Sequence, residues 1–511
     1  MRGLTSYDHY AQERAAFARD QGAFDLSRFV VHFLAVALAA RLVTIFATGL
    51  RDDETYTLVL ARVPALSYFD HPPLHQWLLS AFVRVFGEGR IDRLPFLALS
   101  LLTSFALFGL ARRLFSTTAG WWTVLLFNAC LYFLVLPEGY ILPDQPLLLF
   151  LALGAWAIAE ILYGPPGREA FLWTLAGLAL GFAGLSKYSA AFAPLSLAGF
   201  LVASPQNRHW LRDPRPYLAA ALGLACFAPA IVWNAEHGWV SFGFQSARVA
   251  SRLTLDAAAW RKFADGLVAQ VGLVTPWILW PIAAGMFRAL RTPAGSAEKF
   301  LLWLAAPPLI VFAAMPLLGE RAIAHWFDSG WLFAFPLAGA WMAGRTPLFQ
   351  WRFARAAAAL ALIGVVVNVV AINFGGGLFP GAPDPGRHNR EWPAAELRDA
   401  YRSSGAEFAL VDDWRTGGRL GLALGPGVAI CGMGPDPRGY AYSCDIAAHL
   451  GHDAFVVRNR ANGTAEDERA DFRDLQPLGE LTVGPPGGHQ IGLILRVGRE
   501  LRAPPPLPYG P

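Results

Sequence analysis

Acidic side chains and a histidine gather in one short stretch of the sequence, residues 51–79. Asp53 and Glu54 stand near its start, and Asp70 and His71 follow directly before a pair of prolines. A carboxylate in such a group could take a proton from a hydroxyl or an amine, or it could bind a divalent cation through oxygen. The stretch follows an apolar run long enough to cross a bilayer, so its charges cost free energy unless water, a cation or a reaction uses them. It is therefore the first candidate for a catalytic site.

Each of these residues also has a purely structural interpretation. An acid at the start of a helix often only caps it, and this interpretation suits Asp52 best. Asp53 is instead predicted to be the catalytic carboxylate, with Glu54 beside it. The two prolines stiffen the chain and extend it at His71, so Asp70 and His71 are predicted to bind substrate, although a rigid turn between two interfacial helices would look the same. If a divalent cation is bound, its ligands are expected among these residues other than Asp52.

Further polar residues interrupt the apolar runs. Asp144, between two prolines, is either a helix cap or a substrate ligand. A lysine at position 187 would cost about 2.5–3.5 kcal/mol in mid-membrane, so it either reaches towards the interface or binds a lipid-linked phosphate. A basic outer loop after residue 233 indicates an anionic partner. Besides Asp144, the substrate-binding residues predicted from these segments are Lys187, Tyr188, Asn234, His237, Arg248, Arg321 and His325.

The composition indicates what must position these residues. Of the 511 residues, 55% are hydrophobic and only 16% are charged, whereas soluble domains average about 25% charged residues. The mean hydropathy is +0.37. This pattern predicts an α-helical polytopic membrane protein. The net charge of +4 is modest and does not favour a nucleic-acid partner.

We expect eleven membrane-crossing runs, with the N-terminus in the cytoplasm. In this arrangement every inner loop carries at least one basic residue, as the positive-inside rule requires. The acidic stretch and everything after Phe374 then lie outside. If the break at Lys187 is not a turn, the count becomes ten and the C-terminal region lies inside. The predicted runs are 29–50, 95–115, 119–137, 145–163, 170–186, 188–203, 217–234, 268–290, 300–318, 328–344 and 356–374.

Three domains are predicted: a cytoplasmic segment over 1–28, a transmembrane catalytic domain over 29–374 and a small α/β domain over 375–511. The last region is polar and rich in Pro and Gly, with short apolar runs typical of strands. Cys431 and Cys444 lie in it and could form a disulfide if it is outside the cytoplasm. No glycine-rich phosphate loop is found in the sequence, so we do not expect the membrane part to use a nucleotide directly.

Several motifs occur together in a familiar order. Asp53-Glu54-Thr55-Tyr56 is followed by Tyr-Phe-Asp-His-Pro-Pro-Leu, Pro-Asp-Gln-Pro, Gly-Leu-Ser-Lys-Tyr-Ser, Val-Trp-Asn-Ala-Glu-His-Gly-Trp and His325-Trp326. This series, over roughly residues 40–345, resembles bacterial family 39 glycosyltransferases of the GT-C superfamily, which include protein mannosyltransferases and lipid A aminoarabinose transferases.

The resemblance implies an inverting transferase of the bacterial inner membrane, with its active site facing the periplasm. Its donor would be a sugar on a polyprenyl phosphate, and its acceptor lipid A, another envelope glycan or a protein. Asp53 would be the base, and Lys187 with the outer basic residues would hold the phosphate. In the aminoarabinose transferases a lysine precedes the Pro-Pro pair, whereas this chain has His71. Since a histidine need not be charged near neutral pH, aminoarabinose specificity is not expected here.

Two other classes of protein would also contain many membrane spans. A transporter or flippase of a lipid-linked or anionic substrate would explain the interrupted helices near Lys187 and the basic outer loops. It does not explain grouped acids directly after the first span, or an outer soluble domain. A structural protein of the envelope is the third alternative. Transfer of a labelled sugar, as opposed to its transport alone, separates the enzyme from the transporter.

Overall fold

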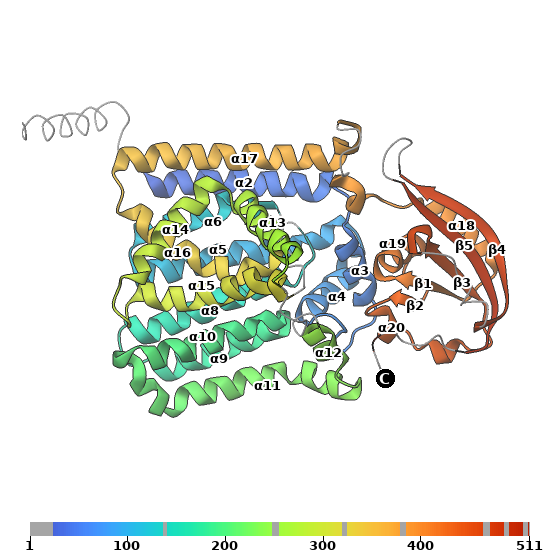
Figure 1. The fold of residues 1–511 in the computed structure, drawn as a ribbon, viewed down its shortest axis with the longest axis horizontal. Coiled ribbons are helices and arrows are strands. Elements are labelled where there is room, and N and C mark those ends of the chain that lie inside the picture. The colour runs from blue at the N-terminus through green and yellow to red at the C-terminus, as the bar shows by residue number, and fades with distance from the viewer. Residues whose placement is uncertain are drawn as a thin grey trace, which may run out of the picture.

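The computed structural model describes residues 24–135, 140–247, 255–318, 324–378, 385–462, 471–484, 490–503 and 509. Figure 1 shows long helices lying side by side in a bundle, with a small sheet beyond one end of it. Helices α2 (Leu26–Ala47) and α17 (Pro347–Leu378) lie along one edge of the bundle, and α11 (Pro214–Glu236) lies along the opposite edge. The architecture is therefore a helical part, with helices long enough to cross a membrane, that carries one small sheet domain.

Within the described residues, seven helices are long and apolar enough to cross a membrane, and two bent helix pairs could raise the number to nine. Every predicted run coincides with helix over most of its described residues, with residues 136–137 outside the described part, but the predicted count of eleven is not confirmed. One reason is the length of individual helices: the run over 119–137 is divided at Cys130, and the run over 328–344 forms a helix of only 16 residues. Apolar composition located the helices but did not set their lengths.

The remaining helices of the membrane part fill the space between these edges. Their bounds are α3 (Asp52–Ala61), α4 (Leu74–Phe86), α5 (Leu94–Leu114), α6 (Thr117–Ala129), α7 (Leu131–Val135), α8 (Asp144–Tyr163), α9 (Glu169–Ser186), α10 (Phe192–Ala203), α12 (Val240–Ala247), α13 (Ala257–Val274), α14 (Pro276–Leu290), α15 (Ala297–Ala314) and α16 (Asp328–Ala343). Each packs on at least one other helix of the bundle: α5 packs on α8, for example, and α8 packs on α9.

Close helix packing in this bundle depends on small residues. Gly177 and Gly181 of α9 face Ala219 and Gly223 of α11. A Cβ added at Gly177 would lie 2.5 Å from the carbonyl oxygen of Ala219. Lipid offers apolar side chains no advantage in meeting one another, so helices in membranes associate by such close backbone approach.

The predicted break at Lys187 is present. Helix α9 ends at Ser186, and Lys187 has an extended backbone with φ −157° and ψ 140°. A short 3₁₀ turn, η2 (Tyr188–Ala191), then leads into α10. The chain is therefore not helical where it carries its buried lysine.

The C-terminal domain contains a five-stranded sheet in the order β2-β1-β3-β5-β4. Strand β1 pairs in parallel with β2 and β3, while β5 pairs antiparallel with β3 and β4. The predicted strand-like runs coincide with β1, β2, β3 and β5; β4 is mostly exposed and has no continuous apolar run. The elements are α18 (Ala394–Ser404), β1 (Phe408–Asp413), α19 (Trp414–Leu424), β2 (Ile430–Asp436), α20 (Tyr440–Ser443), β3 (Ala454–Asn459), β4 (Phe472–Val483) and β5 (Ile491–Leu501).

A disulfide joins Cys431 to Cys444 across 13 positions of the chain. It ties β2 to the residue that follows α20. The pairing is the one expected if this domain lies outside the cytoplasm. The two other cysteines, Cys130 and Cys226, lie in the membrane part and are not disulfide-bonded.

Helix α3 connects the two parts of the molecule. Tyr56, Val59 and Leu60 of α3 belong to the same buried cluster as Trp414 and Leu420 of α19. The two helices approach closely at Gly418, where an added Cβ would lie 2.6 Å from the backbone nitrogen of Tyr56. The helix that carries the predicted catalytic acids is therefore part of the core of the C-terminal domain.

Candidate active site

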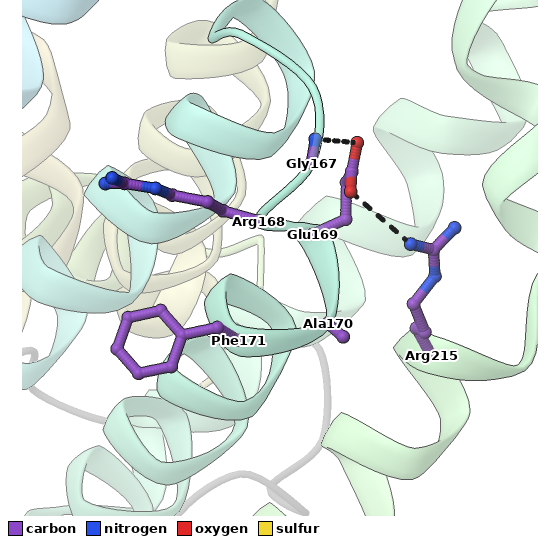
Figure 2. A pocket seen from close by; sticks show the side chains of 6 residues that line it. All are labelled: Gly167, Arg168, Glu169, Ala170, Phe171 and Arg215. Carbon is purple, nitrogen blue, oxygen red and sulfur yellow. Dashed lines mark hydrogen bonds and ion pairs between the residues drawn. The ribbon is translucent and has the colours of Figure 1, made fainter.

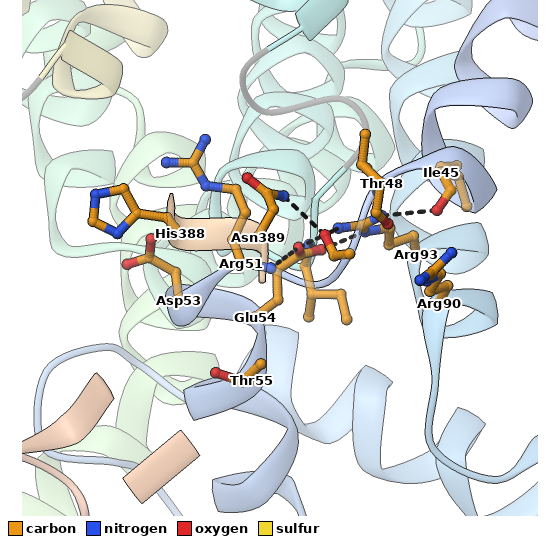
Figure 3. Close-up of polar contacts among 12 residues, drawn as sticks. Ile45, Thr48, Arg51, Asp53, Glu54, Thr55, Arg90, Arg93, His388 and Asn389 are labelled. Carbon is orange, nitrogen blue, oxygen red and sulfur yellow. Dashed lines mark hydrogen bonds and ion pairs between the residues drawn. The ribbon is translucent and has the colours of Figure 1, made fainter. Parts of the chain in front are cut away.

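The first turn of α3 directs three consecutive acids to three different surroundings. Arg51 is the residue before the helix, and its backbone N–H donates to the Glu54 carboxylate at 2.7 Å. This capping arrangement fixes the start of the helix. Asp52 then faces the C-terminal domain, Glu54 faces the helical bundle, and Asp53 is exposed between them. Figure 3 shows this turn and its neighbours.

Glu54 is completely buried and ion-paired. Arg93 donates to both of its carboxylate oxygens, at 2.7 and 2.5 Å, and neither side chain is exposed. The backbone N–H of Ile141 adds a further hydrogen bond of 3.0 Å. Arg93 also donates to the carbonyl oxygens of Ile45 and Thr48, which ties the end of α2 to the same centre (Figure 3). The predicted catalytic role of Glu54 stays a prediction, but its contacts are those of a residue that holds the site together.

Asp52 is bound on both carboxylate oxygens by residues of the C-terminal region. Arg419 of α19 donates to Oδ1 at 2.9 Å, and His388 Nδ1 lies 2.6 Å from Oδ2. Burial opposes the charge of Asp52, but these two partners outweigh it and lower the pKa of Asp52. The capping role predicted for Asp52 is not observed, since the structure shows no side-chain cap hydrogen bond at this helix start.

Asp53 is the exposed acid of the turn. Its backbone carbonyl accepts a hydrogen bond from the Thr57 hydroxyl at 2.8 Å. The charge of Asp53 acts on Arg51 and on His325 of the short helix η5 (Ala324–Phe327). Asp53 therefore combines access from outside with cationic or ionisable neighbours, which is what a general base requires.

A second group of charged residues lies where α8 and α16 begin and α9 ends. Lys187 Nζ is 2.8 Å from Asp144 Oδ1 and 3.8 Å from Asp328 Oδ2, and all three side chains are buried. Asp144 and Asp328 begin α8 and α16, and among the described residues no hydrogen-bond donor reaches Oδ2 of either carboxylate. The structure thus brings the predicted residues Asp144 and Lys187 together and adds Asp328.

The ring of His325 is affected by the charges of both the α3 turn and the group around Lys187. Burial lowers the pKa of His325, and the charges of Asp144 and Asp53 oppose that shift. The charges of the predicted residues Asp53, Asp144 and Lys187 therefore all act on His325. Two further predicted residues, Arg248 and Arg321, lie outside the described part of the chain.

Asp70 faces the C-terminal domain. The Tyr56 hydroxyl donates to Asp70 Oδ1 at 3.1 Å, and an Arg438 nitrogen lies 3.7 Å from Oδ2. Burial, with the charge of Asp70 added, raises the pKa of Tyr56 well above its usual value. The preceding residue, Phe69, is buried and stacks on Tyr442 at 5.3 Å. The motif that contains Asp70 therefore contacts the C-terminal domain extensively, and the predicted substrate role of Asp70 stays a prediction.

His71 lies beside a second, deeply buried histidine. Its ring is 5.8 Å from that of His75, which is almost fully buried in α4. Burial, together with the nearby His71, lowers the pKa of His75 to about 3. His75 is therefore neutral at physiological pH, and of the pair only the more accessible His71 could face a substrate.

The predicted residues around α11 and α12 mainly build the turn between those helices. Asn234 is buried, donates to the Ala230 carbonyl at 2.9 Å and accepts from the backbone of Ser241 at 3.1 Å. The ring of His237 stacks on Trp233 at 4.1 Å. Tyr188 packs against Phe242 at 5.3 Å and Phe227 at 6.3 Å. None of these contacts tests a substrate role, which stays a prediction.

The proposed divalent-cation ligands do not converge. Glu54 pairs with Arg93, and Asp70 is held by Tyr56 and Arg438. In the described part of the chain, the one set of His, Cys, Asp or Glu ligand atoms close enough for a metal includes the disulfide-bonded Cys431 and Cys444. These contacts do not favour a cation shared by the residues predicted to hold it.

A separate cavity of about 450 Å³ lies at the other end of α9, lined by Arg168, Glu169, Phe171 and Arg215 (Figure 2). Glu169 accepts from the backbone N–H of Gly167 and lies 3.7 Å from Arg215. Because α9 runs from Glu169 to Ser186, this cavity is separated from Lys187 by the length of a whole helix, roughly 27 Å. It is not part of the candidate active site.

Sequence reasoning missed several residues of this site. Asp328 begins a helix inside an apolar run, and its position there was the one signal that could have drawn attention to it. The remaining missed residues lie far along the chain from the acids they bind, and each resembles an ordinary charged surface residue in sequence. They are Arg93, His388, Arg419 and Arg438.

Comparison with known proteins identifies part of the chain. Residues 70–233, which include Asp144 and Lys187, match the family described as dolichyl-phosphate-mannose-protein mannosyltransferase. The lipid A galacturonosyltransferase RgtD of Rhizobium johnstonii is 25% identical over 289 residues. That alignment covers 55% of this chain and 58% of RgtD, so it spans little more than half of either protein.

The whole fold is similar to that of ArnT from Cupriavidus metallidurans. Its apo crystal structure has a TM-score of 0.62 at 15% identity, and the similarity covers 92% of this chain and 98% of ArnT. The crystal structure of ArnT bound to undecaprenyl phosphate gives the same score and coverage at 16% identity. The sequence match over residues 70–233 and the fold shared with ArnT over most of the chain agree with the resemblance predicted from the motifs.

Proposed function

We propose that this protein is a membrane glycosyltransferase that moves a sugar from a polyprenyl-phosphate donor to lipid A or another envelope acceptor. The observation that carries the proposal is the position of Asp53. It is the exposed carboxylate of a turn whose other two acids are fixed by ion pairs, and its charge acts on Arg51 and His325. A transporter would not need one free carboxylate held this way at the rim of its bundle.

The chemistry follows from this arrangement. The acceptor oxygen attacks the anomeric carbon, the bond from that carbon to the phosphate oxygen breaks, and polyprenyl phosphate leaves with the electron pair. Asp53 takes the acceptor proton, and inversion results because attack and departure occur on opposite faces of the sugar. The enzyme must align the reactants and stabilise the leaving phosphate, for which one carboxylate and nearby cations suffice.

Among the described residues, Arg51 is the cation that we propose to meet the leaving phosphate. It is half-buried next to the catalytic turn, and the charge of Asp53 acts on it. Lys187 is already compensated by Asp144 and Asp328, so it adds less net positive charge than its position in the sequence suggests. We therefore propose that Arg51 contacts the phosphate and that Lys187 mainly orders the two acids around it.

The donor and acceptor are proposed from the relatives. One crystal structure of ArnT contains undecaprenyl phosphate, and RgtD is a lipid A galacturonosyltransferase. We accordingly propose a polyprenyl-phosphate donor and choose galacturonic acid as the first sugar to test. The bacterial inner membrane with a periplasmic C-terminal domain is the proposed location, in agreement with the disulfide between Cys431 and Cys444.

The test uses the purified full-length protein in lipid nanodiscs, with undecaprenyl-phosphate galacturonic acid and lipid A. We expect Asp53→Asn to lower the rate of transfer by about 10²- to 10⁴-fold, because it removes the base without changing the size of the side chain. The matched control is Asp399→Asn, at an exposed position of α18. Near-normal turnover by Asp53→Asn would disprove the proposed role of Asp53, and movement of the lipid without sugar transfer would favour a transporter.

A further inference from the structure

A short segment between α17 and α18 lies directly on the loop that leads into α3. We call this segment, residues 387–391, the strap. Asn389 donates to the carbonyl oxygen of Gly49 at 2.8 Å, and a Cβ added at Gly49 would lie 2.0 Å from the Asn389 carbonyl oxygen. At its far end, Glu391 pairs with Arg90 at 2.5 Å. Only a glycine permits this approach, so the strap and the loop are fitted to each other.

His388 connects the strap to the catalytic turn. Its Nδ1 lies 2.6 Å from Asp52 Oδ2, and Arg387 Nε donates to its Nε2 at 2.8 Å. An arginine side chain can only donate, so Nε2 must accept and the ring proton lies on Nδ1. His388 therefore donates to Asp52, and its ring lies on the same side of the turn as the carboxylate of Asp53 (Figure 3).

Arg419 completes the arrangement from α19. It binds Asp52 Oδ1 at 2.9 Å, donates to the carbonyl oxygen of Arg390 at 2.7 Å and also donates to that of His388. Its side chain is only 5% exposed. One guanidinium thus binds both Asp52 and the strap. A lysine could not do this with a single point charge.

We infer that His388 and Arg419 are positioning residues for Asp53, so that the C-terminal region forms part of the catalytic unit. The inference rests on the proposed function, in which Asp53 is the base. Glu54 is fixed from the bundle and Asp52 from the C-terminal region, so the backbone of the residue between them is held from both sides while both attachments persist. Loss of the Asp52 attachment lets the first turn rotate or fray and moves Asp53 away from the acceptor.

The same interface offers a matched control at the opposite end of α3. Arg62 pairs with Glu88 at 2.6 Å and donates to the carbonyl oxygens of Gly421 and Gly425 at 3.1 and 3.2 Å. Arg62 therefore also connects α3 to α19, but beyond the last turn of the helix. Its loss weakens docking of the C-terminal domain without touching the turn that carries Asp53.

The experiment compares His388→Ala, His388→Asn, Arg419→Lys and Arg62→Ala in full-length protein, with undecaprenyl-phosphate galacturonic acid and lipid A as probes. We expect His388→Ala and Arg419→Lys to lower kcat by about 10²-fold, the effect of a displacement near 1 Å, with little change in the KM for the donor. His388→Asn should recover most of kcat, since its amide can donate where Nδ1 did. Arg62→Ala should keep a kcat close to that of the wild type.

A second measurement needs no substrate. Hydrogen exchange at the backbone amides of residues 52–55 should accelerate in His388→Ala and not in Arg62→Ala. The inference is overturned if His388→Ala keeps the wild-type kcat and exchange, or if Arg62→Ala loses as much kcat as His388→Ala. If Asp53→Asn remains active or the wild type transfers nothing while the exchange result holds, the proposed function fails and the structural coupling stands.

Discussion

The two sides of α3 are held by different kinds of contact. On the bundle side, Glu54 and Arg93 form an ion pair with no exposure at all. On the side of the C-terminal domain, Asp52 and Asp70 meet Arg419 and Arg438 in contacts that retain some exposure. The bundle side is therefore a desolvated centre, and the other side is a docking surface.

This difference indicates how the two sides should respond to mutation. A fully buried charge that loses its partner has no water to replace it, so the protein loses several kcal/mol. A partly exposed charge can be rehydrated, so its loss costs less stability. We therefore expect changes on the bundle side to affect folding first, and changes on the docking side to affect the geometry of the site first.

The largest effect is expected at the bundle side. Arg93→Ala leaves the Glu54 carboxylate buried and unpaired, and should destabilise the protein by about 3–5 kcal/mol. The measurement is the apparent unfolding temperature of the purified protein, together with its yield from membranes. The double variant Arg93→Ala with Glu54→Leu should recover part of the loss, because it removes the stranded charge. Equal loss in the single and double variants would contradict a role for the ion pair.

The stability of the docking surface and that of the interior of the C-terminal domain should depend on pH in different ways. Burial raises the pKa of Asp412, at the end of β1, to about 6, although a hydrogen bond from Asn462 opposes the shift. Because folding favours the protonated form, the stability from Asp412 is complete below about pH 4 and is lost as the pH rises through 6. The pKa of Asp52 is lowered instead, so its ion pair with Arg419 persists over this whole range.

The corresponding variant is Asp412→Asn. Between pH 4.5 and 7.5 the wild type should lose about 2 kcal/mol that the variant does not lose, given the shift from 3.8 to about 6. Thermal unfolding of the full-length protein at both pH values measures the difference. Parallel pH profiles for wild type and variant would show that Asp412 is not the group responsible.

The smallest effect is expected at the edge of the docking surface. The guanidinium of Arg438 lies 4.3 Å from the ring centre of Trp414 and also faces Asp70. Arg438→Lys keeps the charge but loses the flat stacking surface, so a loss of about 1 kcal/mol is expected. Arg402→Lys, at a pair whose side chains are 76% and 77% exposed, is the control and should not change the unfolding temperature. A loss as large as that of Arg93→Ala would remove the distinction between the two sides.

Much of the helical part could be predicted because its signal is local. An apolar run long enough to cross a membrane can be recognised without knowing which helices it packs against. The predicted runs coincide with helix over most of their described residues. The break at Lys187 was also predictable, since a charged residue between two apolar runs interrupts the pattern. The number of spans was not, because a bend or a short helix leaves the apolar composition unchanged.

The candidate site was predictable only in part. Grouped acids after the first run drew attention to Asp53, and an interrupted run drew attention to Lys187. The neighbouring sequence did not reveal the different surroundings that Asp52, Asp53 and Glu54 have in the folded protein. The partners that distinguish them are 367 positions away for Asp52 and 39 positions away for Glu54.

The sequence by itself determined that this chain forms a bundle of apolar helices with acids at one rim and a small α/β domain after it, because hydropathy and residue type act over a few neighbouring positions. Only the tertiary structure decided which acid remains exposed and that Lys187 is shared between Asp144 and Asp328. The physical reason is that a charge is neutralised by whichever partner folding brings within a few ångströms, and that partner need not be near in sequence.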